Sequence, residues 1–171
     1  MTTAEYNQCV NLYADRVYRF AVKTLQNQYD ANDITQTAFE ILWKNVQNVP
    51  PEKAKSYLFS VAYKSMGEWF RKSNRMHYTS ELPEYGEYQE NSYRQADLQT
   101  LLHNALNTLN ELQKSAILLC DYEGYSYKEI GDILSLSESQ VKIYIFRGRQ
   151  KLQRYLVSIQ KVIWPPKKPI K

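Results

Sequence analysis

Residues 125–156 read "YSYKEIGDILSLSESQVKIYIFRGRQKLQRYL", and this stretch decides the fold of the C-terminal part of the chain. Ser126 with Glu129, and Ser137 with Gln140, have the spacing of capping boxes, in which each side chain caps the backbone of the other residue. The two boxes predict two helices, separated only by the short turn "SLS". Two capped helices joined by a turn of three or four residues are typical of a helix-turn-helix.

The second of these two helices is strongly basic, whereas the first is not. No acid follows Glu138, and residues 142–171 contain nine Lys or Arg. In a helix-turn-helix, the second helix enters the major groove with its N-terminal residues at base edges, and basic residues farther along meet phosphates. We therefore expect DNA contacts from Ser139, Gln140, Lys142, Ile143, Arg147, Arg149 and Lys151. A helical hairpin with a solvated basic face would leave the charge asymmetry unexplained.

Apolar spacing predicts which face of the basic helix is buried. The expected stripe consists of Val141, Ile145, Gly148, Leu152 and Leu156. In the preceding helix, Gly131 falls where the two helices approach closely, so that a larger side chain would push them apart. Ile143, Tyr144 and Phe146 lie off the stripe, and they either contact thymine methyls or pack against the rest of the domain.

The remaining pattern is helical throughout. Apolar residues recur at helical intervals over residues 4–27 and 31–47 and again from about residue 54, while Pro50 and Pro51 interrupt the pattern. A further amphipathic helix begins at Leu98.

These patterns predict an all-α protein with two small domains. Residues 76–97 have a Pro, a Gly, many polar residues and no clear period, which is typical of a flexible linker. The expected division is a three-helix domain at residues 1–75, the linker, and a second domain at residues 98–171 that contains the helix-turn-helix and ends in a basic tail.

The bulk composition restricts the function. The chain has 171 residues, 43% hydrophobic residues and a net charge of +4. The basic C-terminal end and the five acids between residues 81 and 97 suggest a polyanionic partner. Cys9 and Cys120 lie far apart, with no C-x-x-C and no His/Cys cluster, so we expect neither a disulfide framework nor a metal site, and no cofactor. The chain shows no leader and no long apolar run, which predicts a cytoplasmic protein.

Two separate parts of the chain resemble one family. Residues 125–152, together with the preceding "ALNTLNELQKSAILLCDYEG", look like region 4 of the extracytoplasmic-function (ECF) sigma factors of the sigma-70 family. The stretches "LYADRVYRFAVKTLQNQYDANDITQTAFEILWKN" and "KSYLFSVAYKSMGEWFRK" look like region 2 of the same family. The order, the spacing and the variable linker also match, and the resemblance extends from about residue 6 to residue 156.

The resemblance implies a function without catalysis. Such a protein binds core RNA polymerase in the bacterial cytoplasm, directs it to promoters and helps to open the duplex. The first domain docks on the polymerase clamp helices and reads the single-stranded minus-ten element, and the second domain reads the minus-thirty-five element as duplex DNA. The resemblance also implies an anti-sigma factor as a possible further partner, and the sequence does not show whether one exists.

The resemblance also implies which residues dock on the polymerase. Asp33 and Gln36 match the family's docking motif, but the next position, often Glu in the family, is Thr37 here. More of the contact is therefore expected from Phe39 and Trp43, unless these two side chains belong to the core.

The loop "NVPPEKAKS" matches the family's loop that receives a flipped promoter base, although it could also be an ordinary connector. A pocket for an unstacked base needs hydrogen-bonding groups and often a stacking surface. In the following helix, Lys64 and Glu68 stand where the family usually has Asn and Asp. The residues expected to contact the minus-ten element are Lys53, Lys55, Ser56, Tyr57, Lys64, Arg71, Lys72 and Arg75.

Two other functions remain open at this point. One is a helix-turn-helix regulator that binds duplex DNA without polymerase, which binding to core polymerase would distinguish. The other is an enzyme that uses Asp30, Asp33 and Glu40 as metal ligands, but no His joins these acids and no nucleophile–base pair is visible.

Overall fold

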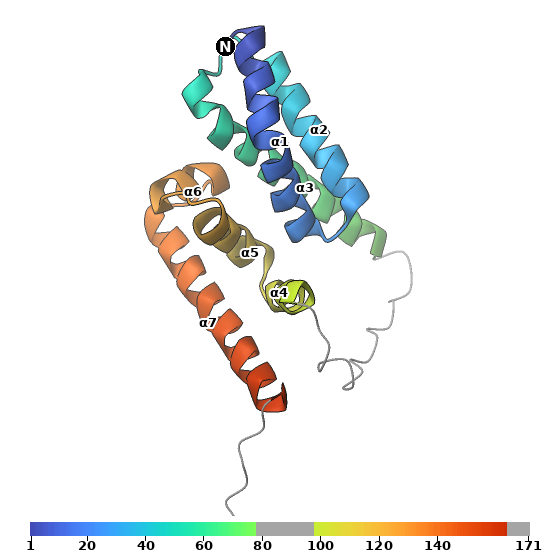
Figure 1. Cartoon of the computed structure of the whole chain (residues 1–171), viewed down its shortest axis with the longest axis vertical. Helices are drawn as coiled ribbons and strands as arrows, with labels where there is room; N and C mark the ends of the chain where they lie inside the picture. The colour runs from blue at the N-terminus through green and yellow to red at the C-terminus, as the bar shows by residue number, and fades with distance from the viewer. Residues whose placement is uncertain (78–97, 164–171) are drawn as a thin grey trace, which may run out of the picture.

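The computed structural model describes residues 1–77 and 98–163, and every regular element within these ranges is helical (Figure 1). The expected all-α class is therefore confirmed. The expected linker lies almost entirely outside the described residues, as does the last part of the basic tail. The elements are α1 (Thr3–Leu25), α2 (Gln28–Lys44), the short 3-10 helix η1 (Pro51–Lys53), α3 (Ala54–His77), α4 (Leu98–Asn107), α5 (Glu111–Ile117), the π-helical turn η2 (Leu118–Tyr122), α6 (Tyr127–Leu134) and α7 (Glu138–Ile163).

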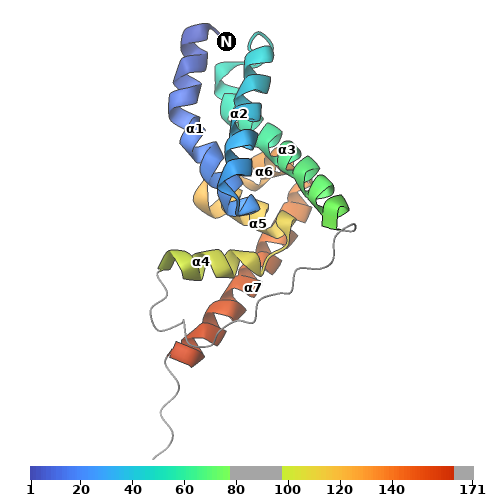
Figure 2. The ribbon, with the colours of Figure 1, turned by 90° about the vertical axis from the view of Figure 1, so that its right-hand side faces the viewer.

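Helices α1, α2 and α3 form the N-terminal half, residues 1–77. Thr2 and Glu5 form a capping box at the start of α1, and the Asn27 side chain accepts hydrogen bonds from the first N–H groups of α2. Helix α3 crosses the α1–α2 pair (Figure 2). The core between the three helices includes Phe20 and Phe59, whose ring centroids are 5.3 Å apart.

Helices α4 to α7 form the C-terminal half, residues 98–163. The two capping boxes expected here, at Ser126 and Ser137, are confirmed, and Asn110 forms a third with Gln113 at the start of α5. The π-helical turn η2, which continues α5, was not anticipated. It ends at the left-handed Gly124, whose φ of 74° suits glycine.

The turn between α6 and α7 depends on Gly131. Ser135 adopts a left-handed conformation with φ of 59°, and the Leu136 N–H donates to the Gly131 carbonyl over 2.9 Å. A Cβ atom at Gly131 would lie only 2.6 Å from the Leu136 carbonyl oxygen. The expected close approach at Gly131 is therefore confirmed, and the nearest group is the backbone of the turn itself.

The buried stripe of α7 departs from the expected one in its later turns. Val141 and Ile145 are buried, and a Cβ atom at Gly148 would lie 2.5 Å from Cδ1 of Ile117. The expectation for Leu156 was wrong, because its side chain is 52% exposed. Ile159 is buried instead, because at about 100° per residue it lies in line with Val141, five turns earlier.

None of the helices in the described part of the chain combines the length and the apolar character needed to span a bilayer.

Gly131→Ala and Gly67→Ala should change stability in opposite directions. At Gly131, the added methyl group meets backbone at 2.6 Å, and we expect the free energy of unfolding to fall by about 1–3 kcal/mol. At Gly67, inside α3, no atom lies within 4 Å of the new Cβ, and better helix propensity should raise stability by up to about 1 kcal/mol. Urea unfolding followed by circular dichroism measures both. A neutral Gly131→Ala would show that the turn is not constrained as described.

Candidate nucleic-acid interface

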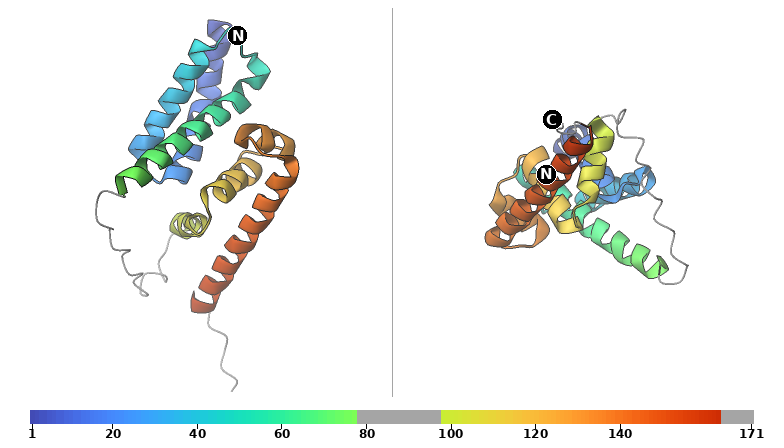
Figure 3. Two further views of the ribbon diagram at one scale, coloured as in Figure 1. Left: turned by 180° about the vertical axis from the view of Figure 1, so that it is seen from behind. Right: turned by 90° about the horizontal axis from the view of Figure 1, so that it is seen from below.

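The exposed face of α7 follows from its buried stripe. Residues on an α-helix are about 100° apart around the axis, so the face opposite Val141 and Ile145 is fixed. Helix α7 packs on α4, α5 and α6, and its other side faces outward (Figure 3). The residues on that outward side, all exposed, are Ser139, Ile143, Phe146, Arg147 and Gln150.

The first turn of α7 combines capping with free polar groups. The Gln140 N–H donates to the Ser137 hydroxyl at 3.3 Å, and the Ser137 N–H donates to Oε1 of Gln140 at 2.9 Å. The Gln140 side-chain oxygen is therefore used for capping. The Ser139 hydroxyl lies 3.0 Å from that of Ser137 and stays exposed at the helix end. This end of the helix thus offers hydroxyl groups to a ligand.

The four cations expected to contact DNA fall into two groups. Arg147 and Lys151 are exposed, and Lys142 forms an exposed ion pair with Glu138 at 2.9 Å. Exposed pairs of this kind contribute little, so Lys142 can exchange Glu138 for a phosphate at small cost.

Arg149 is placed differently from the other three cations. Its guanidinium donates to both carboxylate oxygens of Asp121, the Nε bond measuring 3.3 Å, and this contact raises the pKa of Arg149. The expected DNA contact of Arg149 stays a prediction, and it requires the guanidinium to give up an exposed pair with Asp121 on η2. The Asp121 partner lies 28 residues earlier, and nothing in the local sequence pattern indicates the pair.

The expected polymerase-docking residues do not all lie on the surface of α2. Asp33 and Gln36 are exposed, and Gln36 donates to Glu40 at 3.0 Å. Trp43 is 47% exposed, with its ring 4.8 Å from that of Tyr6. Phe39 is only 8% exposed, because it packs into the core between the three helices. The expectation for Phe39 is therefore corrected, since a partner cannot reach most of its ring.

The residues expected to contact the minus-ten element are mostly accessible on η1 and α3. Ser56 donates to the Lys53 carbonyl at 3.1 Å, and Tyr57 is half-buried beside it. The side chain of Arg75 lies outside the described residues, although its backbone belongs to α3. The exposed cations are Lys53, Lys64, Arg71 and Lys72.

Lys55 is the exception, because it contacts the other half of the protein. Its ammonium donates to the Glu123 carbonyl at 3.4 Å and lies 4.1 Å from the centre of the Tyr125 ring. Burial, with the nearby Arg16 cation, lowers the pKa of Lys55. A residue expected to bind DNA is thus held against the C-terminal half.

The centre of the contact between the two halves is a buried ion pair. Nη2 of Arg16, on α1, lies 2.7 Å from Oε2 of Glu123, whose side chain is 3% exposed. Next to this pair, the Tyr125 ring lies 5.6 Å from that of Phe59. Sequence analysis missed Arg16, Glu123 and Tyr125 as a group, because nothing in the pattern relates positions more than 100 residues apart.

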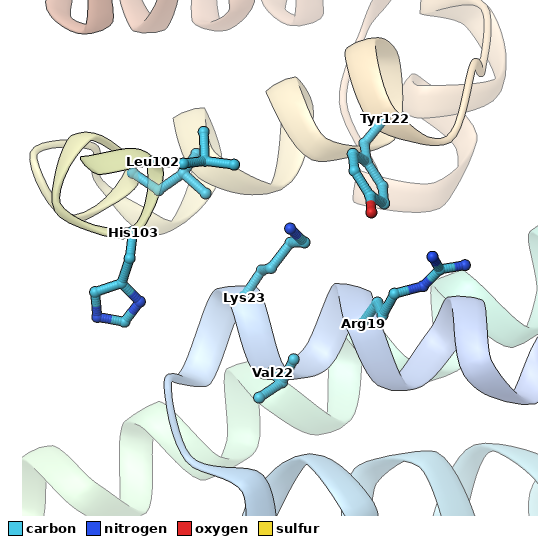
Figure 4. Close-up of a pocket in the computed structure, with 7 residues that line it drawn as sticks. Arg19, Val22, Lys23, Leu102, His103 and Tyr122 are labelled. Carbon is cyan, nitrogen blue, oxygen red and sulfur yellow. The ribbon is translucent and has the colours of Figure 1, made fainter. Parts of the chain in front are cut away.

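Farther along α1, the two halves enclose a hollow instead of a packed interface. Its walls come from α1, α4 and η2 (Figure 4). Lys23 and Arg19 both approach the Tyr122 ring, at 4.6 and 5.8 Å from its centre. None of the described residues that line the hollow is an acid, so this part of the boundary is a basic, water-accessible gap. The residues that line it are Arg19, Val22, Lys23, Leu102, His103, Leu106 and Tyr122.

The metal-dependent alternative has no geometric support. Within the described ranges, no three His, Cys, Asp or Glu side chains are grouped closely enough to hold a metal ion. This includes Asp30, Asp33 and Glu40, of which Glu40 accepts a hydrogen bond from Gln36.

Known proteins match the chain in both halves. The family described as Sigma-70 region 2 matches residues 9–76, and Sigma-70, region 4, matches residues 99–152. The chain is 33% identical over 157 residues to the ECF RNA polymerase sigma factor SigE of Mycolicibacterium smegmatis, covering 88% of this chain and 61% of that protein. It is 30% identical over 132 residues to the ferric citrate uptake sigma factor FecI of Escherichia coli, covering 74% of this chain and 76% of FecI.

A solved structure has the same fold. The sigma factor RpoE of Bartonella quintana, in complex with the anti-sigma factor NepR, superimposes with a TM-score of 0.76 at 24% identity. The match covers 91% of this chain and 98% of that one, so the arrangement of helices is shared over both halves.

Arg16→Ala should destabilise the protein more than Arg19→Ala. Removal of Arg16 leaves the buried Glu123 carboxylate without its cation, and we expect the free energy of unfolding to fall by about 1–3 kcal/mol. Arg19 pairs with Asp15, whose side chain is 73% exposed, so its loss should cost less than about 1 kcal/mol. Adding Glu123→Gln to Arg16→Ala should restore part of the lost stability. Urea unfolding of the wild type, the two arginine variants and the double variant measures these differences. Equal effects of the two arginine variants would contradict a dominant role for the Glu123 pair.

Proposed function

The chain belongs to the ECF sigma factors of the sigma-70 family, and on that premise we propose that it directs core RNA polymerase to specific promoters and assists promoter opening. One observation carries the assignment of DNA binding to α7. The capped turn presents the outward face of that helix, with Ser139 at its start and exposed Arg147 and Lys151 farther along. This is the order of base-reading and phosphate-binding groups that a major-groove helix needs.

The two halves divide the promoter between them in this proposal. The domain of residues 1–75 docks on the polymerase through Asp33, Gln36 and Trp43 and reads the minus-ten element with η1 and α3. The domain of residues 98–171 reads the minus-thirty-five element as duplex, and residues 76–97 connect the two. No catalytic step is assigned to the chain, which works in the bacterial cytoplasm, where the polymerase is. The sigma factor RpoE of Bartonella quintana forms a complex with an anti-sigma factor, and we propose an anti-sigma factor as a further partner of this chain.

Run-off transcription tests the function as a whole. Purified chain and core polymerase, incubated with a library of random upstream fragments, should yield transcripts from a sequence-specific subset. A helix-turn-helix regulator that acts without polymerase would bind duplex DNA but neither co-elute with core enzyme nor produce transcripts.

The docking surface on α2 has its own test. Asp33→Lys combined with Gln36→Ala should weaken the complex with core polymerase, because both side chains are exposed on the face that matches the docking motif. Asp132→Lys, an equal charge change at an exposed site on α6, is the control and should leave the complex intact. Gel filtration with core enzyme measures both variants, and circular dichroism checks that they are folded. Unchanged co-elution of the α2 variant would place docking elsewhere.

The two halves must also separate in this proposal, because Lys55 cannot contact DNA while its ammonium faces Glu123 and Tyr125. We expect energy transfer between dyes attached at Tyr29 and Leu156, both exposed, to fall when core polymerase is added. Arg16→Ala should lower the transfer already in the free chain, because it removes the ion pair between the halves. Transfer that stays constant on binding would contradict the separation.

A further inference from the structure

The outward face of α7 carries two large apolar side chains in its middle. Ile143 is 47% exposed and Phe146 is 62% exposed. Their neighbour Tyr144 is half-buried and packs against the core, so the three apolar residues off the buried stripe do not share one role. Packing within the described part of the chain accounts for Tyr144 but not for Ile143 and Phe146.

Ile143 and Phe146 are three residues apart, so their side chains are neighbours on the helix surface. Cations lie on either side of this apolar pair, with Lys142 toward α6 and Arg147 on the outward face. Lys142 and Arg147 complement phosphate, whereas Ile143 and Phe146 offer no hydrogen bond to a base edge. The thymine C5-methyl is the apolar group that a base edge displays in the major groove.

We propose that Ile143 and Phe146 determine promoter specificity by contacting thymine methyl groups in the duplex element that α7 binds. The inference rests on the proposed function and specifies that function further, because it names thymine as the base that the central turns of α7 recognise. Cytosine lacks the methyl group, so thymine is favoured over cytosine by apolar burial and not by hydrogen bonding. The alternative partner for Ile143 and Phe146 is a protein surface on the polymerase.

Replacing thymine by uracil removes the methyl group and leaves every hydrogen-bonding group of the base pair in place. The full chain, assembled with core polymerase, would be bound to the promoter that run-off selection recovers. Each thymine of its upstream element is then replaced by deoxyuridine, one at a time. We expect binding to weaken about fourfold at one or two positions, the effect of losing one buried methyl group.

Two variants test whether Ile143 and Phe146 cause the weaker binding to uracil-containing DNA. Ile143→Ala and Phe146→Ala should each abolish the uracil effect at one position, and because both side chains are exposed, helical content should not change. Leu156→Ala is the matched control, since Leu156 is 52% exposed on the same helix but lies more than two turns farther on. It should keep the full uracil effect.

The outcomes separate this inference from the function on which it rests. Specific promoter binding with no uracil effect, or with an effect that both alanine variants retain, would overturn the thymine contact alone. Weaker assembly of Ile143→Ala and Phe146→Ala with core polymerase would assign the pair to a protein contact instead. Failure of the wild-type chain to bind core polymerase or to select any promoter would overturn both proposals.

Discussion

The burial of one carboxylate, Glu123, determines how the two halves of the protein meet. A carboxylate with 3% of its side chain exposed is costly unless a cation and hydrogen bonds replace its water. Arg16 on α1 supplies that cation, so the C-terminal half can pack only where Glu123 reaches α1. The Tyr125 ring then lies against Phe59, and the ammonium of Lys55 lies over the Tyr125 ring. These contacts add to the packing of α3 on α6 and of α1 on α5, and together they fix how the halves meet.

Local features of the fold could be predicted because their causes lie a few residues apart. Each capping box joins residues three positions apart, and Gly131 is required by the carbonyl of Leu136, five residues later. Apolar spacing likewise identified Val141 and Ile145 as buried. Such arguments depend only on helix geometry and on the backbone groups that a short turn leaves unpaired.

The candidate site was predicted less completely, because accessibility depends on distant neighbours. Sequence spacing alone could not separate Phe39 from Trp43, and the packing of α1 and α3 against α2 decides that Phe39 is buried. Arg149 looks like its basic neighbours in sequence, yet the unanticipated π-helical turn brings Asp121 to it. Lys55 is covered by residues about 70 positions later. In each case the partner comes from another element of the fold, and no periodicity within one helix can reveal it.

The chemistry of the contact between the halves suits the separation that we propose for binding to DNA. When the halves separate, Arg16, Glu123 and Lys55 all regain water, which offsets much of the lost attraction. A continuous apolar interface would have no such compensation, because exposing it to water is unfavourable over its whole area. The basic hollow beside Tyr122 works in the same direction, since it leaves part of the boundary unpacked and already accessible to water. Apolar contacts flank this polar centre, because α3 packs on α6 and the Tyr125 ring lies against that of Phe59. The arrangement is therefore specific in its geometry, because a buried charge must find its partner, and its polar centre lowers the net energy needed to separate the two halves.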